Sequence, residues 1–276
     1  MNITSGIILA VCAIALIALI VVIIRCIMGR LYLKRVQQDS LIVYGKKGKG
    51  KTLLFSEMTR NEKKGYLSNT DFKHKKGLII EYKDIALDPN TWEKVLNGDY
   101  TQVERKPWEG KGVYLDDAGI FLPNFADSEL KKKYPSLPLA YAVWRHLYNA
   151  PIHINSQAVD RVYKLLREQA DGFIRVRGCV RFLGLAFIRC TYYDRAESAR
   201  QELSPLGARI FNPYSKAEMD KYRAEHGEIK NFLIFAPKWR NKYDSRYFRQ
   251  KFFTDLPTNE KKHHFMLSKR IKKPKK

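Results

Sequence analysis

The sequence predicts an α/β fold with a mostly parallel β-sheet, preceded by one N-terminal transmembrane helix. Residues 7–24 contain only apolar side chains. After them, short apolar and β-branched runs alternate with segments of helical periodicity, an order typical of a parallel sheet covered on both faces. A loop rich in glycine and lysine follows the first of these runs. We therefore expect a membrane anchor joined to an α/β domain.

The N-terminal apolar run is long enough to cross a bilayer. Its 18 residues would span about 27 Å as a helix, close to the hydrocarbon thickness of a membrane. A cleaved signal peptide would need a basic segment before a shorter apolar stretch. Here the positive charges come after it, at Arg25, Arg30, Lys34 and Arg35, and such an excess marks the cytoplasmic flank. We expect a retained single-pass anchor with its N-terminus outside and the rest of the chain in the cytoplasm.

The net charge of +23 indicates an anionic partner, although solvated surface lysines would also account for much of it. Residues 261–276 contain eight Lys and Arg and no acidic residue, and are expected to form a basic tail that binds anionic lipid or DNA. The four cysteines form no CxxC pair or His-Cys spacing of a zinc site, which favours a reducing compartment.

The remaining pattern predicts the order of elements and domains. A hairpin is expected over residues 173–193, flanking Gly178-Cys179. We divide the chain into an anchor (1–29), an α/β domain (30–200), a basic and aromatic region without an assigned fold (201–260), and the tail. Strands are expected at 41–44, 66–68, 78–82, 112–116 and 152–156, and helices at 53–60, 137–149 and 159–169.

The loop after the first strand has the GxxxxGK[ST] spacing of a phosphate-binding P-loop. Such a loop wraps backbone N–H groups around phosphate oxygens at the N-terminus of a helix. Lys51 would reach the β and γ phosphates of ATP, and the Thr52 hydroxyl would be one ligand of Mg²⁺. The predicted ATP-binding residues are Gly45, Lys46, Lys47, Gly48, Lys49, Gly50, Lys51 and Thr52.

A second motif follows about 60 residues later, where the apolar run 112–115 ends in Asp116 and Asp117. After a P-loop, a strand that ends in acidic residues is typical of the Mg²⁺-binding strand. Asp116 would hold the magnesium directly or through water, and Asp117 would orient or deprotonate the attacking water. Asp117 is shorter than the glutamate often found at that place.

Further along, Gln157 follows the strand at 152–156, where it would face the γ-phosphate or simply open the next helix as a surface amide. Arg145 and Arg167 are candidates for contacting the nucleotide of a neighbouring subunit, although most arginines on such helices are solvated. His146 and His153 lie on different predicted elements and are interpreted as structural.

Aromatic and basic residues are mixed in residues 239–243 and 246–249. Such a mixture could stack bases while neutralising phosphates. A small core with a basic outer face would have the same composition.

The chain resembles the filamentous-phage assembly ATPases, the family also named for zonula occludens toxin (Zot). The resemblance covers about residues 40–195. It rests on the P-loop, on Tyr114-Leu115-Asp116-Asp117-Ala118, and on Trp144-Arg145-His146 followed by Ile152-His153-Ile154-Asn155-Ser156-Gln157 and residues 160–167. The family commonly places its membrane span after the ATPase domain, whereas this chain begins with its span.

The resemblance implies an oligomeric inner-membrane ATPase that drives assembly and extrusion of a single-stranded DNA phage. Its implied partners are the host inner membrane, phage coat and assembly proteins, single-stranded DNA and further copies of itself. Two alternatives stay open at this point. One is a DNA-translocating or packaging ATPase related to the FtsK and HerA group. The other is a membrane scaffold that binds nucleotide without hydrolysing it.

Overall fold

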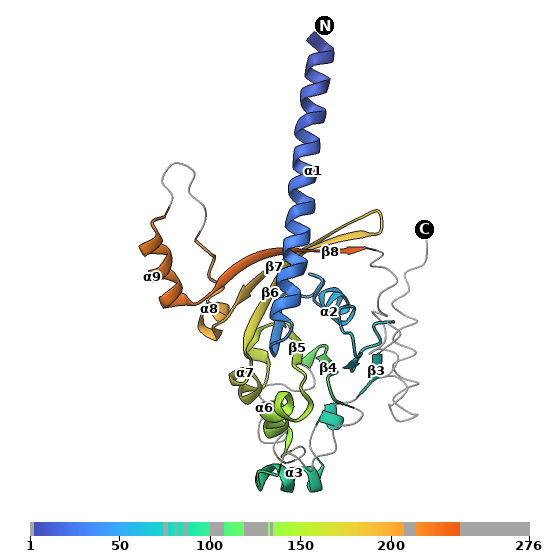
Figure 1. Ribbon diagram of the computed structural model, residues 1–276, viewed down its shortest axis with the longest axis vertical. Helices are drawn as coiled ribbons and strands as arrows, with labels where there is room; N and C mark the ends of the chain where they lie inside the picture. The colour runs from blue at the N-terminus through green and yellow to red at the C-terminus, as the bar shows by residue number, and fades with distance from the viewer. Residues whose placement is uncertain are drawn as a thin grey trace, which may run out of the picture.

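In a computed structural model of the 276-residue chain, eight strands of the described residues form one sheet (Figure 1). The structure describes residues 3–73, 77–80, 82–85, 88–99, 108–118, 132, 135–206 and 214–237. The strands are β1 (Leu41–Tyr44), β2 (Tyr66–Ser68), β3 (Gly77–Ile79), β4 (Gly112–Leu115), β5 (Ile152–Ser156), β6 (Gly172–Phe182), β7 (Leu185–Tyr193) and β8 (Ile229–Pro237).

The sheet is parallel over its first six strands in the order β3-β2-β4-β5-β1-β6, and β7 and β8 extend it in antiparallel fashion. Strand β5 lies between β1 and β4, pairing Ile154 with Ile42 on one side and with Leu115 on the other. The carboxyl ends of β1, β5 and β4 therefore meet at one edge of the sheet. The predicted mostly parallel α/β architecture is confirmed.

Helices cover both faces of the sheet. They are α1 (Ile3–Val36), α2 (Lys51–Thr59), α3 (Pro89–Leu96), α6 (Leu137–Tyr148), α7 (Lys164–Glu168), α8 (Ala196–Arg200) and α9 (Lys216–His226), with 3₁₀ turns η1 (Tyr82–Ile85) and η4 (Val159–Arg161). Alternate strand residues face opposite sides, so that Leu41 and Val43 pack with α1 and α2, while Ile42 and Tyr44 pack with α6, α7 and α8. The continuous apolar runs of the strands are explained by this two-sided burial.

Helix α1 runs without interruption from the apolar segment onto the sheet (Figure 1). The helix over Ile7–Val36 contains a stretch long and apolar enough to cross a membrane by length and composition, and the side chains of residues 7–24 are exposed. The last turns of α1 instead bury Leu33 and Val36 against the sheet. Gly29 lies so close to β8 that a Cβ atom there would be 2.0 Å from the carbonyl oxygen of Leu233. The helix is therefore fixed directly to the sheet.

A buried hydrogen-bond network joins the end of α1 to the central strands. The side-chain amide of Gln37, just after α1, donates to the carbonyl oxygen of Met58 in α2 (2.9 Å) and to the carboxylate of Glu62 (2.7 Å). The Tyr114 hydroxyl in β4 donates to the same Glu62 carboxylate at 2.5 Å and lies 2.8 Å from the Gln37 amide. The end of α1, helix α2 with the residues that follow it, and strand β4 are thus joined by one hydrogen-bond network.

Three details differ from the sequence prediction. The strand expected at 78–82 ends at Ile79, and Tyr82 begins the 3₁₀ turn η1. The hairpin over 173–193 is present, but its turn lies at Leu183-Gly184, which both have positive φ angles (45° and 78°), and not at Gly178-Cys179. Gly178 instead follows a register shift after Val176, where the strand bulges. The single helix expected over 159–169 is two short pieces, η4 and α7, because Val162 between them is extended (ψ 141°).

The region after residue 200, to which no fold was assigned, contains α9 and the outer strand β8. Strand β8 pairs with β7 over its whole length, from Tyr193↔Ile229 to Leu185↔Pro237. The domain boundaries drawn from the sequence stay predictions. The basic tail 261–276 and the aromatic and basic segments at 239–243 and 246–249 lie outside the described residues.

The contact between Gly29 and Leu233 predicts that this glycine is required for stable packing of α1 on β8. Replacing Gly29 by Ala should lower the free energy of unfolding of the detergent-solubilised chain by about 1–3 kcal/mol, because backbone or helix must shift to admit the methyl group. Met28→Ala is the matched control, since the Met28 side chain is 60% exposed. Equal stabilities of the two variants in urea denaturation would contradict the packing argument.

Candidate nucleotide-binding site

The loop between β1 and α2 has the backbone shape of an anion cradle. Gly45, Gly48 and Gly50 all have positive φ angles (148°, 78° and 101°), which L-residues rarely adopt. At Gly45 a Cβ atom would also lie 2.6 Å from the carbonyl oxygen of Val176 in β6. The loop therefore depends on glycine for conformation and for its close approach to β6.

Helix α2 begins at Lys51 directly after this loop, with Gly50 at its N-cap and no side chain capping it. The first N–H groups of such a helix have no intrahelical acceptor and attract negative charge. The Lys51 side chain is only 7% exposed, and its Nζ lies 3.5 Å from the carbonyl oxygen of Lys46 across the loop. Burial lowers the pKa of Lys51, and the carboxylates of Asp117 and Asp116 act in the opposite direction.

Asp116 lies at the carboxyl end of β4, with 3% of its surface exposed. Its carboxylate accepts hydrogen bonds from the Nδ2 group of Asn155 in β5, from the Thr52 side chain in α2, and from the backbone N–H of Asp117 (3.2 Å). Lys51, Thr52 and Asp116, which the two motifs place in one site, are therefore brought together.

The backbone of Asp116 is held in place by Asn69, which follows β2. The Asp116 N–H donates to Asn69 Oδ1 at 2.8 Å, and Asn69 Nδ2 donates to the Asp116 carbonyl oxygen at 2.9 Å. Sequence reasoning missed both Asn69 and Asn155. The available signal was the position of these amides at the ends of apolar strands next to the strand of the acidic pair.

Burial and the neighbouring charge of Asp117 raise the pKa of Asp116 to about 7, against the opposing effects of the Thr52 hydrogen bond and of Lys51. A cation placed beside a buried carboxyl group of this kind stabilises its charged form. The Thr52 hydroxyl and the Asp116 carboxylate are hard oxygen donors of the type that Mg²⁺ prefers. The residues present thus fit a magnesium ion held jointly with phosphate oxygens. Among the described residues no cluster of three or more His, Cys, Asp or Glu forms a metal site on its own.

Asp117 is partly exposed and has a positive φ of 52°, an uncommon backbone conformation for a residue other than glycine. Its charge affects both Asp116 and Lys51. The carboxylate therefore lies close to the predicted phosphate position, while its role as a base stays a prediction.

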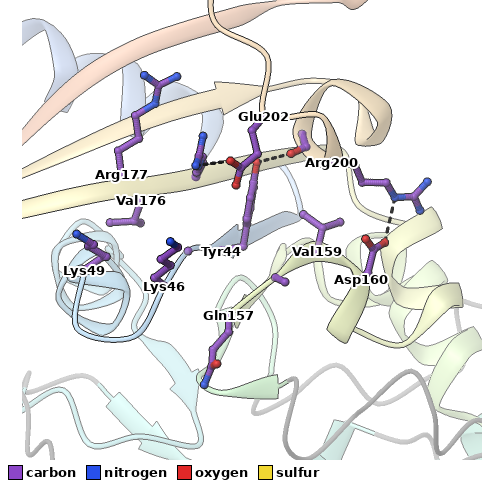
Figure 2. A pocket seen from close by; sticks show the side chains of 14 residues that line it. Tyr44, Lys46, Lys49, Gln157, Val159, Asp160, Val176, Arg177, Arg200 and Glu202 are labelled. Atoms are coloured by element: carbon purple, nitrogen blue, oxygen red, sulfur yellow. Dashed lines mark hydrogen bonds and ion pairs between the residues drawn. The ribbon is translucent and has the colours of Figure 1, made fainter.

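A cavity of about 500 Å³ lies beside the loop, between the ends of β1 and β5 and residues 175–177 of β6 (Figure 2). Lys46 and Lys49 of the loop and Arg177 of β6 line one side of it, and Asp160 and Glu202 lie on the other side. The negative charges are paired, with Asp160 3.1 Å from the Nε atom of Arg200 and Glu202 in contact with Arg175. The cavity is consequently basic next to the phosphate loop.

Gln157, at the end of β5, is exposed and lines this cavity. Its Oε1 atom accepts a hydrogen bond from Arg161 (2.8 Å). The structure thus places Gln157 at the same edge of the sheet as the P-loop, next to Ala158 and Lys46 in the cavity wall. Whether it senses the γ-phosphate stays a prediction.

The two candidate intersubunit arginines are both engaged within the chain. Arg145 lies 3.5 Å from Asp39 and 3.7 Å from Asp171, residues that precede β1 and β6 and so lie at the opposite edge of the sheet from the P-loop. Arg167 is largely buried and contacts Asp160. Of the two histidines, His153 is fully buried beside Tyr114 and burial lowers its pKa to about 3, whereas His146 is exposed.

No family model matches the chain, and no curated protein matches it. Among solved structures it is similar to the N-terminal domain of zonular occludens toxin from Neisseria meningitidis, with 14% identity and a TM-score of 0.44 over 75% of this chain and 98% of that one. It is also similar to the genome-packaging NTPase B204 of Sulfolobus turreted icosahedral virus 2 in complex with AMP (18% identity, TM-score 0.33, 52% and 77% of the two chains). A third is the pCW3 conjugation coupling protein TcpA with ATPγS (14% identity, TM-score 0.32, 55% and 58%).

At these scores the likenesses to solved structures add nothing to the geometry described above.

The raised pKa of Asp116 predicts that the stability of the chain depends on pH in the absence of nucleotide and divalent cations. Because its pKa is raised from 3.8 to about 7 on folding, the unfolded state loses the proton first, and stability should fall as pH rises through that window. Asp116→Asn should therefore stabilise the chain more at pH 8 than at pH 5, by a difference on the order of 2 kcal/mol. Urea denaturation in EDTA at both pH values measures it, and an equal effect at the two would contradict the raised pKa.

The strand order, the glycine-dependent loop at the N-terminus of α2 and the acid at the end of β4 together make this a P-loop NTPase fold.

Proposed function

We propose that the chain is a membrane-anchored ATPase that uses ATP hydrolysis to drive assembly and extrusion of a filamentous single-stranded DNA phage. The observation that carries the ATPase part is the meeting of Lys51, Thr52 and Asp116 at one edge of the sheet, where Thr52 hydrogen-bonds the buried Asp116 carboxylate. The phage-related part rests on the motifs shared with the Zot-like family.

Different groups around the loop would bind different parts of the nucleotide and its metal ion. The N–H groups of the loop and of the first turn of α2 bind phosphate oxygens, and Lys51 adds a compact positive charge. Thr52 and Asp116 would hold Mg²⁺, which would supply positive charge to the phosphates during phosphoryl transfer. Asn155 and Asn69 fix the Asp116 carboxylate and backbone, respectively, so that the acid needs no reorganisation to accept the ion.

The charges beside the site support a polyanionic ligand. Lys46, Lys49 and Arg177 line the cavity wall next to the loop. Asp117, which follows Asp116 directly, would orient the water that attacks the terminal phosphate. Membrane anchoring through α1, with the nucleotide site on the cytoplasmic side, is supported by the exposed apolar surface of residues 7–24 and by the cations that follow it.

Loss of the Lys51 ammonium group should abolish turnover. In the full-length chain in detergent, Lys51→Ala is expected to reduce Mg²⁺-dependent phosphate release from ATP at least about a hundredfold, since a transition-state charge contact is lost. Lys216→Ala is the control, because Lys216 lies exposed on α9. Equal rates in wild type and Lys51→Ala would eliminate an ATPase and favour a nucleotide-binding scaffold.

Phage extrusion is tested in cells that carry the complete phage genome. With Lys51→Ala in place of the wild-type chain, intracellular single-stranded phage DNA should be made normally, while particle release, counted by plaque assay, should fall by orders of magnitude. Normal release would exclude a role in extrusion. Movement along double-stranded DNA by the purified chain, without capture of major coat protein, would instead identify a DNA translocase of the FtsK and HerA type.

A further inference from the structure

The tip of the β6–β7 hairpin exposes large apolar side chains. Val180 is 57% exposed, Phe182 66% and Leu183 82%, and Leu185 on the returning strand is 36% exposed. The strands stay paired up to the turn, where Phe182 lies opposite Leu185. No helix or strand in the described part of the chain covers them. A contiguous apolar tip on an ordered hairpin marks a contact site.

The charge of the hairpin is entirely positive. Residues 172–193 contain four arginines and no Asp or Glu. Arg181 is exposed next to the tip, and Arg189 is exposed farther back on the returning strand, where it pairs with Gly178. Apolar side chains beside arginines suit the interface of a membrane that contains anionic lipids, where the apolar groups enter the headgroup region and the guanidinium groups pair with phosphates.

The strand register places the tip close to the end of the apolar span. Gly29 of α1 contacts Leu233 of β8, which pairs with Arg189 of β7, and Arg189 pairs with Gly178 of β6. From this crossing the hairpin continues four residues to Phe182, about 13 Å along the strand. In α1 the last residue of the apolar run, Ile24, is five residues before Gly29, about 8 Å along the helix.

Figure 1 shows that the hairpin extends sideways from the crossing, away from α1, and that its turn lies slightly above the end of β8 in the view, on the side toward the N-terminus of α1. A membrane that contains residues 7–24 thus has its cytoplasmic surface near the level of the turn. The turn of the hairpin and the apolar part of α1 both lie beyond the point where α1 crosses β8, although they are far apart in the sequence.

We propose that the tip of the hairpin, Val180, Phe182, Leu183 and Leu185, inserts into the headgroup region of an anionic membrane beside α1. This inference rests on the membrane anchoring proposed above. It gives the domain a second point of membrane contact, which restrains rotation about the axis of α1.

The test uses the full-length chain reconstituted into vesicles of phosphatidylcholine and phosphatidylglycerol. Cys12, Cys26 and Cys179 are replaced by Ser, buried Cys190 is retained, and an environment-sensitive fluorophore is attached at Leu183→Cys. The matched control is Leu96→Cys, since Leu96 is 61% exposed at the end of α3, far from the N-terminus of α1 (Figure 1). The label at residue 183 should be quenched by nitroxide-bearing lipids and several-fold less by aqueous iodide than the label at residue 96.

Three outcomes would overturn the inference, and they are distinguishable. If alkaline carbonate extracts the chain from the vesicles, the anchoring itself is wrong. If the chain is retained but iodide quenches both labels equally, the anchoring stands and only the insertion of the hairpin tip is wrong. Protection from iodide without quenching by nitroxide lipids would mean that the tip is covered by protein, such as a second copy of the chain.

Discussion

A buried carboxylate at the end of a central strand is the constraint on which the site depends. Asp116 has almost no contact with water, and only polar groups from neighbouring elements make its charge tolerable. Thr52 comes from α2, Asn155 from β5 and Asn69 from the end of β2. The strand order, in which β5 lies between β1 and β4, is what allows these groups to converge.

This arrangement also separates binding from structural support. In the proposed site the P-loop would contribute backbone N–H groups and Lys51 to the nucleotide, whereas Asn155 and Asn69 hold the carboxylate and the backbone of Asp116. Preorganised dipoles of this kind stabilise charge at no reorganisation cost. A raised pKa in the absence of ligand is the expected sign of a site that is completed by a cation.

Much of this could be predicted from the sequence, because the strongest signals are local. The run at 41–44, the GxxxxGK[ST] spacing and the pair Asp116-Asp117 each identify an element or a residue type without knowledge of the fold. The sequence did not reveal Asn69 and Asn155, since an amide at the end of a strand becomes part of a site only through strand order. The position of the hairpin turn depended on positive φ at Leu183, which no residue preference of leucine suggests. Strand β8 belongs to the sheet because it pairs with β7, and the short apolar run at residues 232–235 was not enough to assign it from the sequence.

The contact between Gly29 and Leu233 has a consequence for access to the nucleotide site. Leu233, which Gly29 contacts, pairs with Arg189, and Arg189 pairs with Gly178. The neighbours of Gly178 in β6, Val176 and Cys179, lie close to Gly45 and Gly50 of the loop. The loop therefore lies against the same part of the sheet as Gly29, which is about 8 Å along the helix from the end of the apolar run. With the membrane anchoring and ATP binding proposed above, ATP would reach the loop of a chain in an anionic bilayer through the layer of counterions next to the headgroups, where polyphosphates are depleted and divalent cations are enriched. The local supply of substrate would then vary with lipid charge and ionic strength as well as with the concentration of ATP in bulk solution.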